Sequence, residues 1–97
     1  MKNKNTIIAF LKSQKKFLNN NYGVKSIGLF GSYARGSENE LSNIDVIVEL
    51  KEPRFDWMAG LKIFLESKME MKVDLVRKRK GVKSYTMKAI EEEAIYA

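Results

Sequence analysis

The short connection between two apolar segments narrows the folds open to this chain more than any other feature. The segment VKSIGLF (residues 24–30) contains β-branched residues, and IDVIVEL (residues 44–50) alternates between two faces, so both patterns predict strands. The chain between them, from Gly31 to about Ser42, is too short for the crossover that parallel strands need. We therefore expect an antiparallel pair, joined by a loop or by one or two helical turns that begin near Ser32.

Apolar residues at helical spacing occupy the segments around these strands. The spacing predicts amphipathic helices over residues 6–20 and 55–68 and a final helix over residues 84–97, while KVDLV (residues 72–76) predicts a third strand. Elements in this order predict an α/β (α+β) fold, with a small mixed β-sheet flanked by helices. No repeat, low-complexity tract or linker divides the chain, so we expect a single domain over residues 1–97.

Two residue types are missing, and their absence restricts the chemistry. The 97 residues include no cysteine and no histidine. This excludes disulfides, zinc fingers, cysteine or histidine nucleophiles and histidine general bases. Any catalysis must therefore use carboxylates, hydroxyls, lysines or a bound hard cation.

The N-terminal segment does not have the pattern of a targeting sequence. Its apolar run extends only from Ile7 to Leu11 before Lys12 interrupts it, which is too short for a signal sequence or a membrane span. We therefore expect a cytoplasmic protein with no membrane partner.

The chain is basic, with a formal net charge of +6. Much of the positive charge lies in Lys12, Lys15 and Lys16 of the first predicted helix and in the segment Arg77–Lys80. Such charge favours nucleic acid, nucleotide phosphates or an acidic protein as a partner. A solvated helix face and a charged loop explain the same residues, so the charge alone does not choose a function.

Three polar residues on the predicted strands form a candidate metal site. Asn43 and Asp45 are two positions apart, so their side chains point to one side of the strand with Cα atoms about 6.5 Å apart. Asp74 lies between apolar neighbours in the third strand and joins them if that strand pairs beside the second. A solvated sheet face or a lysine partner explains either acid alone, but less readily both together with the glycine-serine turn before them.

The turn at Gly31 and Ser32 is a candidate phosphate site. Gly31 lets the backbone approach a ligand closely, and the amides and hydroxyl around Ser32 can bind phosphate oxygens. Arg35 could clamp a triphosphate as a charged donor. An exposed loop arginine that serves solubility is an equally good interpretation of Arg35.

The spacing of these motifs matches a known family. The strings GLFGSYARGSENELSNIDVIVEL, FDWMAGLKIFLES and KVDLV together resemble the minimal nucleotidyltransferase (MNT-type) domains of the polymerase-β superfamily. The resemblance implies that ATP binds at the Gly31–Ser32 turn and that Mg²⁺ is held by three acidic positions, here Asn43, Asp45 and Asp74. It also implies two-metal chemistry at the α-phosphate, with the third position helping to activate the attacking hydroxyl.

The same resemblance implies a protein partner. Small members of the family are commonly antitoxins encoded beside a helical HEPN-type ribonuclease toxin, and some transfer AMP from ATP to a toxin tyrosine. We therefore expect a HEPN-type toxin as partner, in a homo- or hetero-oligomer. Aromatic residues such as Phe55, Trp57, Tyr85 and Tyr96 exceed what a small monomer readily buries, although ordinary core and rim packing would also explain them.

Asn43 departs from the family pattern, because the family has an aspartate at this position. An amide lacks the charge and the second anionic oxygen with which a carboxylate bridges two cations, and Mg²⁺ prefers hard anionic oxygens. We therefore expect impaired AMP transfer. The chain could be a natural variant without activity, a weak enzyme with one well-held metal, or the product of a deliberate aspartate-to-asparagine change.

A binding module without chemistry is the alternative function. Such a protein would neutralise a toxin by occlusion, or bind RNA through Arg77–Lys80. Asn43 favours this alternative, whereas Asp45, Asp74 and the intact Gly31–Ser32 turn oppose it. Direct nucleic-acid binding is the less favoured form.

Overall fold

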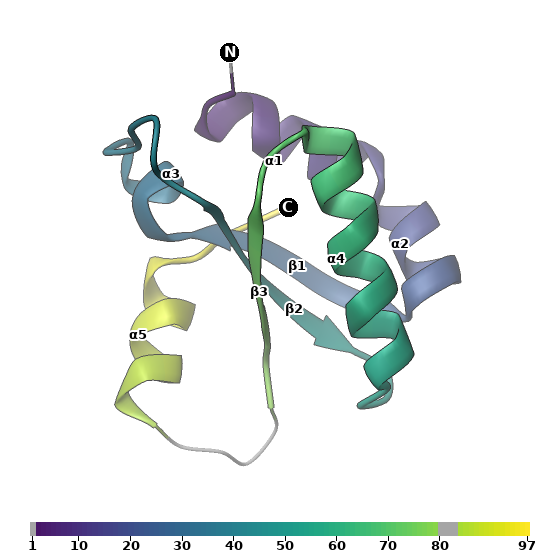
Figure 1. The fold of residues 1–97 in the computed structure, drawn as a ribbon. Helices are drawn as coiled ribbons and strands as arrows, with labels where there is room; N and C mark the ends of the chain where they lie inside the picture. The colour runs from purple at the N-terminus through teal and green to yellow at the C-terminus, as the bar shows by residue number, and fades with distance from the viewer. Residues whose placement is uncertain (1, 80–83) are drawn as a thin grey trace.

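A computed structural model describes residues 2–79 and 84–97 of the chain (Figure 1). The order of elements agrees with the pattern of the sequence, except that the first predicted helix is divided in two and a short strand follows the last helix. The elements are α1 (Lys4–Ser13), α2 (Lys15–Tyr22), β1 (Val24–Phe30), α3 (Gly31–Arg35), β2 (Ile44–Leu50), α4 (Phe55–Met69), β3 (Val73–Arg77), α5 (Tyr85–Glu93) and β4 (Ile95–Tyr96).

The strands form one mixed sheet in the order β3-β2-β1-β4. β1 pairs antiparallel with both β2 and β4, and β2 pairs parallel with β3. The antiparallel β1–β2 pair confirms the inference from the short connection, which contains the short helix α3. The parallel β2–β3 pair is joined by α4, which supplies the longer crossover that parallel strands need.

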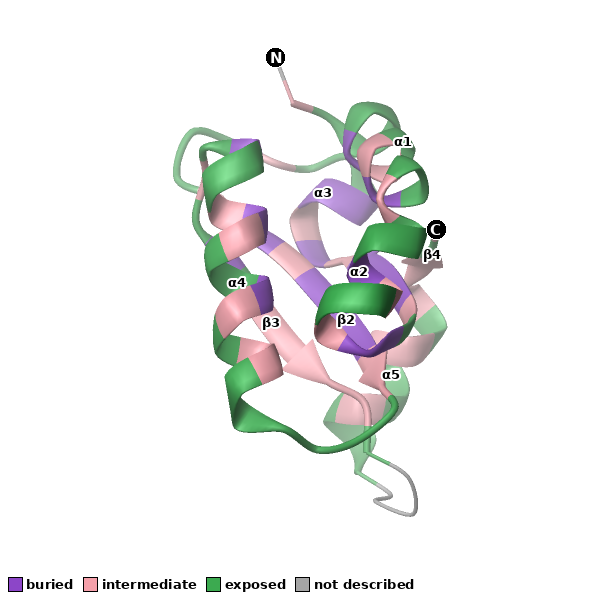
Figure 2. Ribbon diagram, turned by 90° about the vertical axis from the view of Figure 1, so that its right-hand side faces the viewer, coloured by how far each residue is buried: buried purple, intermediate pink, exposed green. Residues whose placement is uncertain are grey.

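The main hydrophobic core lies between the sheet and the helices α1, α2 and α4. These helices contribute fully buried residues such as Ile7, Leu18 and Leu65, which pack with Leu29 and Val46 of the strands. Helix α5 lies on the other side of the sheet, behind it in the view of Figure 2, and has no fully buried residue. The two faces of the sheet are therefore covered very unequally.

Two expectations about helix boundaries are wrong. The predicted helix over residues 6–20 is two helices, because the backbone of Gln14 leaves the helical region (φ −102°, ψ 3°) and ends α1 before α2 begins. The final helix does not continue to residue 97. It ends at Glu93, and Ile95 and Tyr96 pair with Leu29 and Gly28 at the free edge of β1.

At Ile95 and Tyr96, pairing with β1 overrides local helix propensity. The helices of the described residues include none that is long and apolar enough to cross a membrane.

Candidate functional site

The two aspartates of the predicted trio lie next to each other in the sheet. Asp45 of β2 is the Cα partner of Asp74 in the parallel β2–β3 pair, and Phe30, the last residue of β1, is the partner of Asp45 on its other side. Neighbouring strands are about 4.8 Å apart, so the two carboxylates project together from the same face. The structure thus brings Asp74 to Asp45, as the alternation of the strands predicts.

Asn43 joins the two aspartates, but as a hydrogen-bond donor. It precedes β2 by one residue, and its Nδ2 donates to Oδ2 of Asp74 at 3.2 Å. A carboxylate can only accept from a neutral amide, so this bond fixes which end of the Asn43 side chain faces Asp74. An aspartate at position 43 would instead repel Asp74 unless a cation or a proton lay between them.

Gly31 places the start of α3 directly against Asp45. Its φ of +73° lies in the left-handed region that glycine tolerates. A Cβ atom at this position would lie 2.1 Å from Oδ2 of Asp45, which is closer than any real contact. The glycine is therefore required both by its backbone angle and by the aspartate, and it is followed in α3 by the half-buried Ser32.

Arg35 ends α3 and forms an ion pair with Glu93, the last residue of α5. Both charges act on Asp45: Arg35 lowers its pKa, and Glu93 raises it. Arg35 thus lies at the candidate site as the sequence suggests, but its guanidinium is engaged by an acid from the opposite end of the chain. Sequence reasoning missed the role of Glu93, although the acidic run Glu91–Glu93 is complementary in charge to Arg35.

The net effect of these surroundings is to raise the pKa of Asp45 above its ordinary value of 3.8. Burial is the largest cause, followed by the charge of Asp74 and a hydrogen bond with Asp74. The carboxylate pair is electrostatically unfavourable by itself. A nearby cation would relieve both the burial and the repulsion.

The donor set fits a hard divalent cation. Asp45 and Asp74 supply anionic oxygens. Asn43 faces Asp74 with its amide nitrogen, so its amide oxygen would join them only after the amide group turned over. Among the described residues, no group of three or more Asp, Glu, His or Cys side chains could hold a metal. The set is therefore one charge short of a three-carboxylate site.

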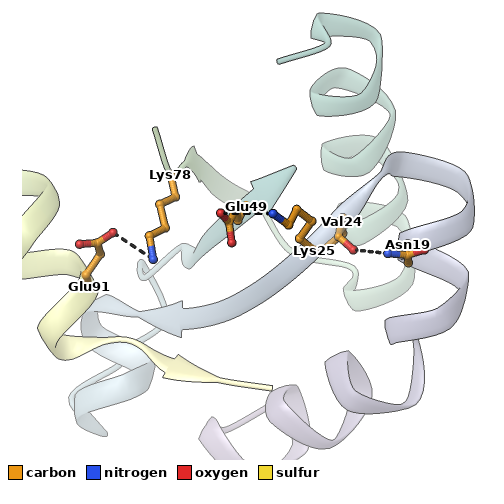
Figure 3. Close-up of polar contacts among 6 residues, drawn as sticks. All are labelled: Asn19, Val24, Lys25, Glu49, Lys78 and Glu91. Atoms are coloured by element: carbon orange, nitrogen blue, oxygen red, sulfur yellow. Dashed lines mark hydrogen bonds and ion pairs between the residues drawn. The ribbon is translucent and has the colours of Figure 1, made fainter. Parts of the chain in front are cut away.

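One cation of the basic segment Arg77–Lys80 is engaged by an acid within the protein. Lys78 forms an ion pair with Glu91 of α5 at 3.3 Å (Figure 3), and this contact raises the pKa of Lys78. Arg77 is half-buried at the end of β3. Lys80 lies outside the described residues. This segment is thus a weaker candidate for RNA binding than its sequence suggests.

Comparison with known proteins identifies the class to which this fold and site belong. The sequence profile of the nucleotidyltransferase domain matches residues 11–97. A chain of Methanocaldococcus jannaschii, provisionally named a protein adenylyltransferase, is 44% identical and is aligned over 99% of both chains. The protein adenylyltransferase MntA of Thermococcus cleftensis is 37% identical over 93% of this chain and 91% of its own. The chain belongs to the nucleotidyltransferase domain family.

Solved structures agree with this assignment. A chain provisionally described as a minimal nucleotidyltransferase has a TM-score of 0.79 and 29% identity, covering 97% of this chain and 95% of its own. A chain in the toxin-antitoxin complex MntA–HpeT has a TM-score of 0.67 and 26% identity, with coverage of 98% and 72%. A chain of a toxin-antitoxin crystal structure with AMP-PNP has a TM-score of 0.58 and 30% identity, with coverage of 84% and 61%.

Proposed function

We propose that this chain is an MntA-like antitoxin, one minimal nucleotidyltransferase domain over residues 1–97 that binds ATP and pairs with a HEPN-type toxin. The observation that carries the proposal is the register of Asp45 beside Asp74, with Gly31 fitted against Asp45. The similarity to MntA and to chains of toxin-antitoxin structures supports the partner class. The similarity to a chain crystallised with AMP-PNP supports ATP as the nucleotide.

Different residues of the site would bind the triphosphate and the cation. The Gly31–Ser32 turn would receive the triphosphate at the start of α3, where backbone amides are free to donate. Arg35 would add a positive charge by exchanging Glu93 for a phosphate oxygen. Asp45 and Asp74 would hold Mg²⁺, which when bound supplies positive charge at the phosphate and at the attacking oxygen. Asn43 would add its amide oxygen only if its amide group turned over and released Asp74.

The reaction would be AMP transfer. A hydroxyl oxygen of the toxin, on a tyrosine by analogy with the family, forms a bond to the α-phosphorus of ATP as the bond to the β-phosphate oxygen breaks. Pyrophosphate leaves, and the hydroxyl proton passes to the carboxylate of Asp74. Asn43 hinders this step in two ways, because it contributes no charge and because its amide occupies an oxygen of Asp74.

We therefore propose that transfer by this chain is weak and that replacing Asn43 by aspartate strengthens it. The test is transfer of labelled AMP from ATP to the co-purified toxin, measured for this chain and for Asn43→Asp. We expect strong labelling with Asn43→Asp and at least about tenfold less with Asn43, equivalent to about 1.4 kcal/mol. Equal strong labelling by both proteins would contradict the proposal.

Occlusion without chemistry is a second candidate, and the Asn43–Asp74 hydrogen bond is the observation that favours it. This bond gives the carboxylate of Asp74 a hydrogen-bond donor when no metal is bound. An occluding antitoxin would suppress the toxin equally well after Asp45→Asn and Asp74→Asn, and Asn43→Asp would not restore labelling. Suppression that requires both aspartates would exclude this candidate.

A further inference from the structure

The net positive charge of the chain comes from its first 37 residues, which contain no acidic residue. Residues 1–37 contain seven Lys and Arg residues and no Asp or Glu, whereas residues 38–97 contain eleven Lys and Arg and twelve Asp and Glu. The first part accounts for the whole excess of charge, since the second part is slightly acidic. In the structure this first part is α1, α2, β1 and α3.

Five of these cations line two hollows on α1 and α2. One hollow, with a volume of about 240 Å³, is lined by Lys15 and Lys16 of α2 and by Lys25 of β1. The other, of about 410 Å³, is lined by Lys4 and Lys12 of α1. The remaining lining residues are neutral: Asn19, Val24, Ser26 and Ile27 in the first hollow, and Asn5, Ile8, Ala9 and Ile95 in the second.

The two hollows adjoin neighbouring parts of α1, α2 and the strand pair β1–β4. Lys12 and Lys16 are four residues apart on helices that only Gln14 separates. Ile95 in the second hollow pairs with Leu29 of β1, two positions after Ile27 in the first. We name this region, defined by Lys4, Lys12, Lys15, Lys16 and Lys25, the basic face.

The cations of the basic face are weakly compensated. Lys25 approaches Glu49 only to 3.9 Å, which is longer than a hydrogen bond, and its side chain is 44% exposed. Figure 3 shows Lys25 between Glu49 and the Asn19–Val24 hydrogen bond. The Lys78–Glu91 pair in the same view is shorter, at 3.3 Å. Lys4, Lys12, Lys15 and Lys16 are exposed. The basic face therefore keeps most of its charge available for an anion.

The composition of this face fits RNA better than a protein. Protein interfaces are depleted in lysine and enriched in aromatic residues and arginine, but all five cations here are lysines, and the lining contains no aromatic side chain. Lysine, asparagine and serine are typical phosphate and sugar ligands. The lysines line hollows, and a positively charged hollow can follow the backbone of a flexible single strand.

We propose that the basic face binds the phosphate backbone of single-stranded RNA, with Ser26 and Asn5, which line the two hollows, as the contacts for ribose 2′-hydroxyls. The binding site is separate from the carboxylate pair. It is also separate from the Arg77–Lys80 segment, whose Lys78 is engaged by Glu91. RNA binding here requires neither nucleotide nor toxin, so it does not depend on AMP transfer.

The test is fluorescence anisotropy with a labelled RNA of about twelve nucleotides, titrated between about 50 and 200 mM salt. We expect affinity to fall steeply with salt. The variant Lys12→Gln/Lys15→Gln/Lys16→Gln should weaken binding at low salt by at least about tenfold and make the salt dependence shallower, since each lost phosphate contact removes about 0.7 from the slope for a single strand.

A matched variant, Lys62→Gln/Lys68→Gln/Lys88→Gln, removes the same charge from exposed lysines of α4 and α5 and should retain most of the affinity. Thermal unfolding of both variants checks that they fold equally well. Equal weakening by both variants, or no RNA binding by the original chain, would overturn the proposal. Equal affinity for DNA of the same sequence would overturn the assignment to RNA, and equal affinity for polyglutamate would assign the face to an acidic protein.

Discussion

The two faces of the sheet are built in different ways. On one face, α1, α2 and α4 bury apolar residues such as Leu11 and Leu65 completely. On the other face, α5 buries none of its residues fully, and two ion pairs, Arg35–Glu93 and Lys78–Glu91, connect it to α3 and to the residue after β3. The residues that stabilise the fold and the residues of the candidate site therefore lie on opposite faces of the sheet. The packed face holds the strands in register, and the open face presents Asp45 and Asp74.

We expect the largest difference in stability between the two faces when one aliphatic side chain is shortened on each. Leu65→Ala on the packed face should lower the free energy of unfolding by about 3 kcal/mol, because it leaves a cavity in a fully buried region. Ile90→Ala on the half-buried α5 should cost only about 1 kcal/mol. Urea denaturation followed by circular dichroism measures the free energy of unfolding of both variants. Equal losses of stability would show that the two faces contribute equally to packing.

The second prediction concerns the turn against Asp45. Gly31→Ala should cost about 2 kcal/mol, because the new Cβ adds a collision with Asp45 to the strain of a left-handed backbone. Gly36 provides the control, since it has a similar φ of +75° but a Cβ atom added there would have no neighbour within 4 Å. Gly36→Ala should cost about 1 kcal/mol from backbone strain alone. A cost for Gly31→Ala no greater than the control would argue against the close contact.

Asp45 should give the open face an unusual pH dependence. Its pKa is raised in the folded state, so the folded protein binds more protons than the unfolded chain at pH values just above 3.8. The contribution of Asp45 to the free energy of unfolding therefore decreases as pH rises through this interval. At neutral pH, Asp45→Asn should stabilise the metal-free protein by about 0.5 to 1 kcal/mol, since it removes a like-charged neighbour of Asp74.

Asp56 is the matched control for this effect. A hydrogen bond with Arg54 lowers its pKa, so Asp56→Asn should change stability at neutral pH in the opposite direction. Chemical denaturation at pH 7 and at pH 4 compares the two variants. A loss of stability for Asp45→Asn at pH 7 would contradict the proposed repulsion.

The smallest expected effect is that of the ion pair between α3 and α5. Double-mutant cycles with Arg35→Gln and Glu93→Gln should give a coupling energy of about 0.5 kcal/mol, because both side chains are partly exposed to solvent. The coupling should nearly disappear in about 1 M salt, where charges are screened within about 3 Å. Hydrogen exchange of the α5 amides should nevertheless accelerate in either variant, and unchanged exchange would show that the pair does not restrain α5.

The packed face and the aspartate pair could be predicted from local patterns. The alternation of residues within the second and third predicted strands placed Asp45 and Asp74 on one face on the condition that these strands pair, and the parallel β2–β3 pair meets that condition. The pairing of Ile95 with Leu29 could not be predicted in this way, because it depends on the edge of β1 that the folded sheet leaves free. The break at Gln14 leaves no signal in the apolar spacing of residues 6–20.

The polar contacts of the open face were harder to predict. The bond from Asn43 to Asp74 depends on side-chain orientation across two strands, and the contact of Glu93 with Arg35 joins segments far apart in the chain. The spacing of apolar and polar residues in the sequence does not predict either contact.

Binding of AMP-PNP to the isolated chain, followed by isothermal titration calorimetry with and without Mg²⁺, tests the central claim most directly. We predict Mg²⁺-dependent binding that Asp45→Asn and Asp74→Asn each weaken by at least about tenfold and that Asn43→Asp strengthens. Binding that is independent of Mg²⁺ and unchanged by both aspartate substitutions would show that the nucleotide does not use the carboxylate pair.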